Sequence, residues 1–147
     1  MTLQRWLLNE WLTPHKTSRQ EISDLFAVAD RDLSDCQSPG LSPDWKLNIA
    51  YNAALQTATA ALAAAGYRAV REAHHYRIIQ SLAYTIGAPA GLVAQVDQFR
   101  KKRNSGEYER AGMTSDQEAK EMFLLATKIR SDVEVWLRKA HPELLGE

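Results

Sequence analysis

A run of four cations at positions 100–103 follows directly on an apolar stripe of helical spacing. The stripe consists of Leu92, Val96 and Phe99, whose intervals of four and three residues indicate the buried side of a helix. One further step of four residues lands on Arg103. An Arg on the inner side of a helix is expected either to pair with an acid or to point into a cleft or a subunit interface. Its planar, five-donor guanidinium is suited to hold an anion such as a phosphate.

Two interpretations of this run stay open. In one, Arg103 lines an anion site, and Arg100, Lys101 and Lys102 contribute to substrate binding. In the other, Arg103 forms a buried ion pair with a carboxylate on another helix, and Lys101 and Lys102 form an ordinary solvated face. Arg100 stands four residues before Asn104 and shares its helix face, so it fits either interpretation.

Two adjacent histidines, His74 and His75, are a second candidate for chemistry. Adjacent side chains on a helix point about 100° apart, so the pair alone does not predict a metal site. We expect no metal and no cofactor. A weaker hypothesis is that His75 or Tyr76 reaches the basic run from the neighbouring helix and supplies a proton-transfer group.

The composition is that of an ordinary globular domain. The chain has 147 residues, of which 45% are hydrophobic and 24% charged, and its formal net charge is zero. Any anion site must therefore be a local patch rather than a property of the whole surface. The single cysteine, Cys36, excludes an internal disulfide framework and a cysteine-based zinc cluster.

No apolar run approaches the ~20 residues that a membrane-spanning helix needs. The first residues also lack the basic segment, apolar run and small cleavage residues of a signal peptide. We therefore expect a cytoplasmic protein without a membrane partner.

Helical spacing recurs along the chain and period-two alternation persists nowhere, so the sequence predicts an all-α, antiparallel bundle of about five to six helices. Capping residues and glycines set the expected bounds of the first three helices at residues 3–12, 18–32 and 44–65. A fourth helix is expected to contain residues 76–86, and a fifth to start near 89 and include the basic run. The last helix is expected from about 115 to 141. Ser105-Gly106 is expected to kink or interrupt the fifth helix.

We expect one domain over residues 1–147, with a core at about 18–138 and the helix at 3–12 packed on it. Trp6 and Trp11 suggest that this first helix docks by its aromatic side. A dimer contact is the alternative role for these two rings, because tryptophan is enriched at interfaces.

The order of helices and the run at 100–104 followed by Tyr108 resemble the HEPN (higher eukaryotes and prokaryotes nucleotide-binding) domain family. The segment 51–55 and the pair His75-Tyr76 are also similar to that family, and the resemblance spans roughly residues 18–138. It implies a helical bundle that forms a homodimer. It further implies either a metal-independent endoribonuclease, whose two motifs meet across the dimer, or a module that binds nucleotides or RNA, often beside a nucleotidyltransferase partner.

The family motif is an Arg, a polar residue and then a His four to six positions beyond the Arg. Arg103 corresponds to the motif Arg, Asn104 to its polar neighbour and Tyr108 to the position of the His, so the His is not matched. Cleavage without a metal needs a base and an acid. A tyrosine with a pKa of ~10 is a poor base at neutral pH. Glu107 would supply a base, but its charge would also repel phosphate.

The first functional hypothesis is therefore nucleotide or RNA binding, with a degenerate ribonuclease site and a role in a toxin–antitoxin or defence system implied by the resemblance. Its candidate catalytic residues are Arg103, Asn104 and Tyr108, and its substrate-binding residues are Arg100, Lys101, Lys102 and His75. The second hypothesis is a non-catalytic dimerisation or interaction module in which the Arg-Asn motif is structural.

Overall fold

The computed structural model describes residues 2–104 and 114–146. Within them the chain forms six α-helices, two short strands and one 3-10 helix, so the predicted all-α bundle is confirmed. The elements are α1 (Leu3–Leu8), β1 (Leu12–Pro14), α2 (Arg19–Asp35), α3 (Pro43–Ala64), β2 (Tyr67–Ala69), α4 (His74–Thr85), α5 (Ala90–Asn104), α6 (Asp116–Ala140) and η2 (Pro142–Leu145).

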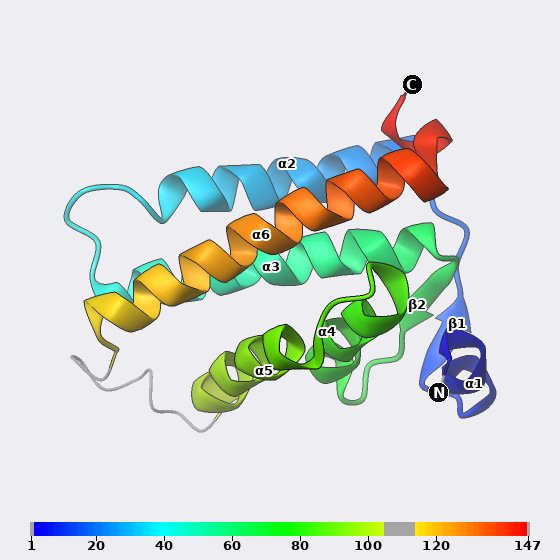
Figure 1. Cartoon of the computed structure of the whole chain (residues 1–147), viewed down its shortest axis with the longest axis horizontal. Helices are drawn as coiled ribbons and strands as arrows, with labels where there is room; N and C mark the ends of the chain where they lie inside the picture. The colour runs from blue at the N-terminus through cyan, green and yellow to red at the C-terminus, as the bar shows by residue number, and fades with distance from the viewer. Residues whose placement is uncertain (1, 105–113, 147) are drawn as a thin grey trace.

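Helix α3 is the centre of the molecule. It packs against α2, α4 and α6, and α2 runs antiparallel to it, whereas α6 runs beside it in the same direction (Figure 1). Thirteen of its residues are buried, and eight of them are alanines (Ala50, Ala53, Ala54, Ala58, Ala60, Ala61, Ala63 and Ala64). These small side chains allow neighbouring backbones to approach closely, so one helix can be covered on several sides.

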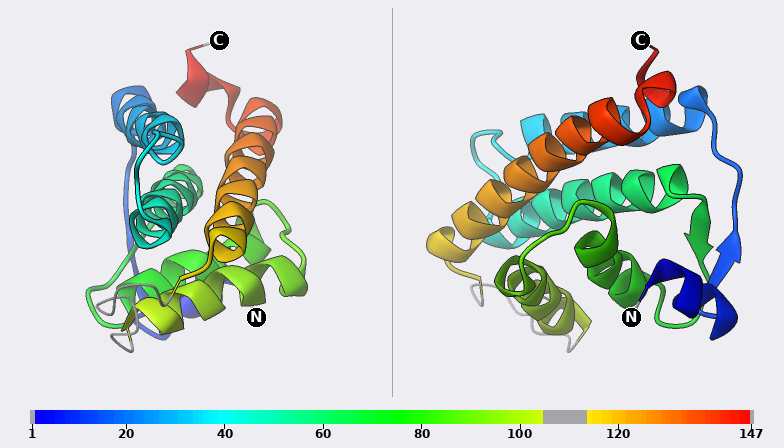
Figure 2. Two further views of the ribbon diagram at one scale, coloured as in Figure 1. Left: turned by 90° about the vertical axis from the view of Figure 1, so that its left-hand side faces the viewer. Right: turned by 45° about the vertical axis from the view of Figure 1, so that its right-hand side comes forward.

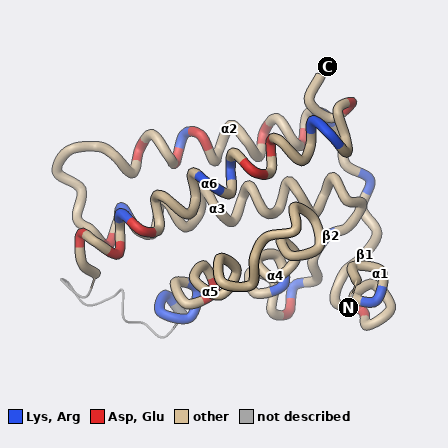
Figure 3. Tube along the Cα trace, in the orientation of Figure 1, with Lys and Arg blue, Asp and Glu red and all other residues tan. Residues whose placement is uncertain are grey.

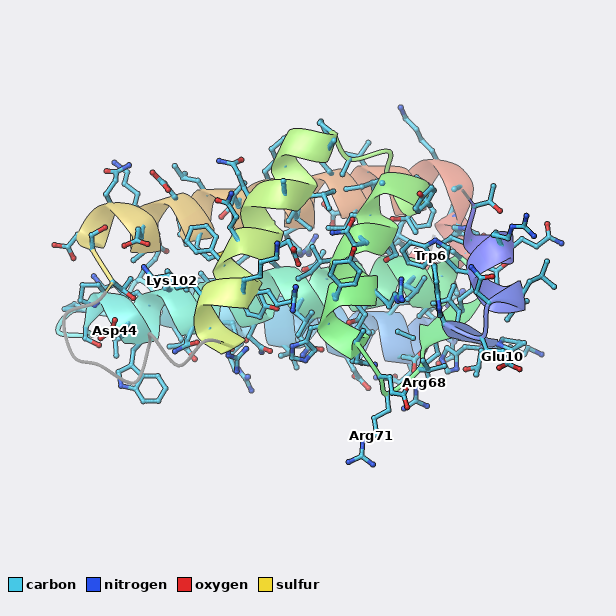
Figure 4. The ribbon with its side chains drawn as sticks, turned by 90° about the horizontal axis from the view of Figure 1, so that it is seen from below. Trp6, Glu10, Asp44, Arg68, Arg71 and Lys102 are labelled. Carbon is cyan, nitrogen blue, oxygen red and sulfur yellow. The ribbon has the colours of Figure 1, made fainter. Side chains whose placement is uncertain are left out.

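Helices α4 and α5 form a second layer. They lie side by side on one face of the layer made by α2, α3 and α6, and they cross those helices (Figures 2 and 4). The buried side of α5 consists of Leu92, Val93 and Val96, with Phe99 half-buried. The predicted apolar stripe of this helix is therefore confirmed.

The predicted capping residues begin their helices. The Ser18 side chain accepts a hydrogen bond from the backbone of Glu21, and Ser42 precedes Pro43 at the first position of α3. Ser115 caps α6 and forms a reciprocal capping box with Glu118. The interruption expected at 105–106 lies outside the described residues.

The N-terminal segment differs from the prediction of one helix over 3–12 and of no strand. Helix α1 ends at Leu8, because Glu10 adopts a left-handed backbone with φ of 65°. Leu12 then begins β1, which pairs antiparallel with β2 and places Leu12 opposite Ala69. Strands of three residues are too short to show an alternating pattern, and their partners are far apart in the sequence, so local spacing could not reveal them.

None of the helices in the described part of the chain is both long and apolar enough to cross a bilayer. Positive residues are concentrated at the C-terminal end of α5, where the tube in Figure 3 shows a compact blue segment.

Candidate functional site

The last turn of α5 and the first turn of α4 lie at the same edge of the molecule, above the middle of α3 (Figure 4). We call the five side chains that gather there the basic cluster. Two guanidiniums come from α5, an imidazole and a phenol from α4, and a second phenol from α3: Arg100, Arg103, His75, Tyr76 and Tyr51.

Arg100 is held in place by a buried acid on its own helix. Its Nε donates to Oδ1 of Asp97 at 2.6 Å, and the two side chains are 16% and 9% exposed. The Cζ of Arg100 lies 5.2 Å from the centroid of the Tyr76 ring. Asp97 also forms an ion pair with Lys101, whose Nζ lies 3.6 Å from Oδ2 of Asp97. The sequence left open whether Arg100 serves a site or a salt bridge, and the structure shows the salt bridge with the guanidinium beside the aromatic ring.

Arg103 does not continue the buried stripe of α5 as its spacing predicts. The residue is exposed, and its Cζ lies 5.4 Å from the centroid of the Tyr51 ring. The guanidinium thus lies over the buried Tyr51 ring instead of entering the bundle. Among the described residues no carboxylate forms an ion pair with Arg103, so the expected buried ion pair is also wrong.

Tyr51 is 1% exposed, and its hydroxyl finds no hydrogen-bond partner in the described part of the chain. Burial raises the pKa of Tyr51 to about 12, against the smaller opposing effects of Arg103 and Arg100. The phenol therefore stays neutral at physiological pH. It offers an aromatic face to Arg103 but cannot act as a base there.

His75 lies next to these cations. Its ring centroid is 6.4 Å from that of Tyr51. Although the residue is exposed as a whole, partial burial of its ring is the main cause that lowers its pKa from 6.5, with further effects from His74, Arg103 and Arg100. Its imidazole is thus neutral at pH 7 and carries one nitrogen that can accept a proton.

A shallow pocket of about 440 Å³ joins the start of α4 to α5. It is lined by Ala73, His74, His75, Tyr76 and Arg100. The structure thus brings His75 and Arg100, two of the predicted substrate-binding residues, to one pocket. His74 donates a hydrogen bond from Nδ1 to the Val70 carbonyl at 3.1 Å, which fixes its ring at the pocket wall.

The two lysines of the run differ from each other. Lys101 is 68% exposed, as a solvated face requires. Lys102 is only 19% exposed, and its Nζ donates to Glu118 of α6 at 2.5 Å, so the prediction of a solvated Lys102 is wrong. The fold brings Glu118, the capping-box residue of α6, next to the end of α5. The contact between Lys102 and Glu118 therefore joins residues that are sixteen positions apart in the sequence.

Two predicted catalytic positions are not described. Asn104 is the last residue of α5, and its side chain lies outside the described part. Tyr108 lies outside the described residues altogether. Sequence reasoning also missed Asp97 and the role of Tyr51. The signal for Asp97 was its place three and four residues before Arg100 and Lys101, the spacing of ion pairs on a helix.

No group of three or more His, Cys, Asp and Glu side chains within the described ranges could hold a metal ion. Comparisons of the chain with models of protein families, with curated proteins and with solved structures found no match. A functional proposal for this chain therefore rests on the residues and the chemistry of the basic cluster.

Proposed function

We propose that this chain binds RNA or a nucleotide through the basic cluster, as its resemblance to the HEPN domain family implies. One observation carries the proposal: the Arg103 guanidinium lies exposed over an aromatic ring and has no carboxylate partner in the described part of the chain. Its donors are free to form charge-assisted hydrogen bonds with phosphate oxygens. Arg100 and Tyr76 line a pocket together with His75, whose imidazole is neutral and close enough to Arg103 for that cation to lower its pKa.

The proposed catalytic capacity is weak. Cleavage without a metal begins when a base removes the 2′-hydroxyl proton and the 2′-oxygen attacks phosphorus, which expels the 5′-oxygen. His75 is the proposed base, because its lowered pKa keeps it neutral, and Arg103 would stabilise the charge on phosphorus. The leaving 5′-oxygen would take its proton from water. Binding is therefore the main function, with a degenerate endoribonuclease activity.

The same resemblance supports a homodimer, a role in a toxin–antitoxin or defence system and a nucleotidyltransferase-type partner. In this arrangement the basic clusters of two copies would line one composite cleft. Sedimentation velocity of the purified chain tests the dimer directly.

Fluorescence anisotropy with a labelled single-stranded RNA, in EDTA and at several salt concentrations, tests the binding proposal. Loss of a charge-assisted hydrogen bond predicts that Arg103→Ala lowers RNA affinity about tenfold or more. Arg138→Ala removes the same charge from the last turn of α6, far from the cluster, and is the matched control. Equal affinities of these two variants would contradict the proposal. Cleavage that survives both Arg103→Ala and His75→Gln would point to a contaminating nuclease.

The ion pairs of α5 favour a second candidate, a non-catalytic interaction module. Asp97 engages Arg100, and Lys102 ties α5 to α6, so part of the cationic run already has a structural role. In this alternative the Arg103 side chain braces a dimer. Arg103→Ala would then dissociate the dimer in sedimentation velocity and leave RNA affinity unchanged.

A further inference from the structure

A second pocket opens on the other side of α4 from the basic cluster. Helix α5 lies on one side of α4, and α1 with Trp6 lies on the other (Figure 4). The pocket has a volume of about 260 Å³, and we call it the aromatic pocket. Its lining consists of Trp6, Trp11, Tyr76, Arg77, Gln80, Ala83 and Tyr84.

The rings of this pocket form a rigid wall. Trp6 packs edge to face against Trp11 at 5.9 Å between ring centroids and against Tyr84 at 5.3 Å. Trp6 is buried, Trp11 is half-buried and Tyr84 is 41% exposed. Tyr84 therefore offers aromatic surface to solvent from a position that the buried indole fixes.

Arg77 is stacked on this wall. Its Cζ lies 3.6 Å above the centroid of the Trp11 ring, at van der Waals contact. No carboxylate among the described residues pairs with Arg77, so the stack holds the guanidinium flat without neutralising it. A guanidinium plane held in this way can itself stack on a base, and its N–H groups remain available to an acceptor.

Tyr76 connects the two pockets, since its ring lines both. Arg100 and Arg77 lie 5.2 and 5.5 Å from the centroid of that ring. A path from the basic cluster to the aromatic pocket therefore crosses only the Tyr76 ring. The guanidinium of Arg100 from α5 and that of Arg77 from α4 lie beside this ring.

We infer that the occupant of this path is single-stranded RNA, with a phosphate in the basic cluster and a neighbouring base in the aromatic pocket. The inference rests on the proposed function and adds the class of RNA and a base subsite. A duplex keeps its bases stacked on one another, so only an unpaired base can reach the rings. The volume is slightly below the ~300–1,000 Å³ of pockets for drug-sized ligands, which suits one base and not a whole oligonucleotide.

A proline-rich peptide is the competing occupant of an aromatic groove. The charges favour RNA, because such a peptide would leave Arg103 without an anion, whereas a nucleic-acid backbone supplies one.

The test compares an oligoadenylate with an abasic RNA of the same length, which carries the phosphates without the bases. We expect the wild-type chain to bind the oligoadenylate roughly 5- to 100-fold more tightly. Tyr84→Ala and Arg77→Gln should remove most of that preference and leave the affinity for the abasic RNA close to that of a charge-matched control. Arg68→Gln is this control for Arg77→Gln, because Arg68 is an exposed residue of β2 that does not line the aromatic pocket.

A direct reading of the pocket comes from fluorescence. In the background W45F/W136F only Trp6 and Trp11 remain, and oligoadenylate, but not the abasic RNA, should quench their emission. Thermal unfolding of each variant checks its fold. If Tyr84→Ala does not fold, the base preference of Arg77→Gln and the quenching of tryptophan emission test the inference.

An equal affinity of wild type for both RNAs would overturn the base subsite and leave the proposed function standing, provided that Arg103→Ala weakens both. If neither RNA binds the wild-type chain, the proposed function itself fails. Quenching by a proline-rich peptide and not by oligoadenylate would assign the pocket to a protein partner and refute the inference.

Discussion

The guanidinium of Arg103 lies 5.4 Å from the centroid of the Tyr51 ring, although the two residues come from different helices. Beneath it, the Tyr51 hydroxyl is buried and has no hydrogen-bond partner among the residues that the structure describes. An exposed cation thus lies above an aromatic ring whose polar end is not satisfied. Tyr51 therefore contributes both to the packing of α3 and to the aromatic surface beneath Arg103 in the basic cluster.

Tyr51→Phe should stabilise the free protein. The substitution keeps the ring under Arg103 and removes a buried hydroxyl that lacks a partner, so the free energy of unfolding should rise by about 1 kcal/mol. Urea denaturation of the variant and of wild type measures the difference. Tyr84→Phe, at a more exposed position, is the control and should change stability little. A loss of stability in Tyr51→Phe would mean that the hydroxyl is hydrogen-bonded after all.

Lys102→Met should destabilise the bundle. The side chain is mostly buried and is bonded to Glu118, so its replacement removes a tie between α5 and α6 and leaves that carboxylate without its cation. Because Glu118 is one-third exposed, solvent weakens the pair, and we expect a loss of about 0.5–1 kcal/mol in urea denaturation. Lys101→Met makes the same change at a 68% exposed position and should be nearly neutral. Equal losses of stability in Lys102→Met and Lys101→Met would contradict a structural role for the Lys102–Glu118 pair.

RNA affinity should increase as the pH falls through the range around and below 6.5. His75 is neutral in the free protein, because burial, His74, Arg103 and Arg100 lower its pKa from 6.5. A bound phosphate favours the imidazolium and raises that pKa, so binding takes up a proton. Internal phosphodiesters do not titrate in this range. Anisotropy titrations from pH 7.5 to 5.5 measure the slope, which should flatten in His75→Gln, and an unchanged slope would exclude His75 from the site.

Thr17→Val should weaken the fold at neutral pH but not in acid. The Thr17 hydroxyl donates to Glu21 at 2.6 Å and is the largest cause that lowers the pKa of Glu21 below its ordinary value of 4.5. His15, 2.7 Å from the same oxygen, contributes in the same direction. A lowered folded-state pKa stabilises the fold above 4.5, and this contribution is lost as the pH falls through the folded-state value.

Melting temperatures from pH 7 to pH 3 measure this effect. The difference between wild type and Thr17→Val should be largest near neutrality and shrink below pH 4.5. Thr13→Val, at an exposed position of β1, is the control. A difference that stays constant over the whole range would show that the Thr17 hydroxyl does not act through the charge of Glu21.

The sequence by itself determined the helices from α2 onward, because their signals are local. Ser18, Ser42 and Ser115 each accept a hydrogen bond from a backbone N–H three residues away, and the apolar stripe of α5 depends only on spacing within one helix. Such interactions are complete within a few residues, so a pattern of residue types is enough to predict them.

Only the tertiary structure decided the environments of Arg103, Lys102 and His75. The same stripe that placed Leu92 and Val96 in the core predicted that Arg103 lies on the inner side of the helix, but the residue is exposed and its guanidinium lies over the Tyr51 ring of α3. Lys102 became structural because Glu118 folds next to it. His75 reached the cluster because α4 packs beside α5. Burial and charge pairing between helices depend on neighbours far along the chain, and no local spacing contains that information.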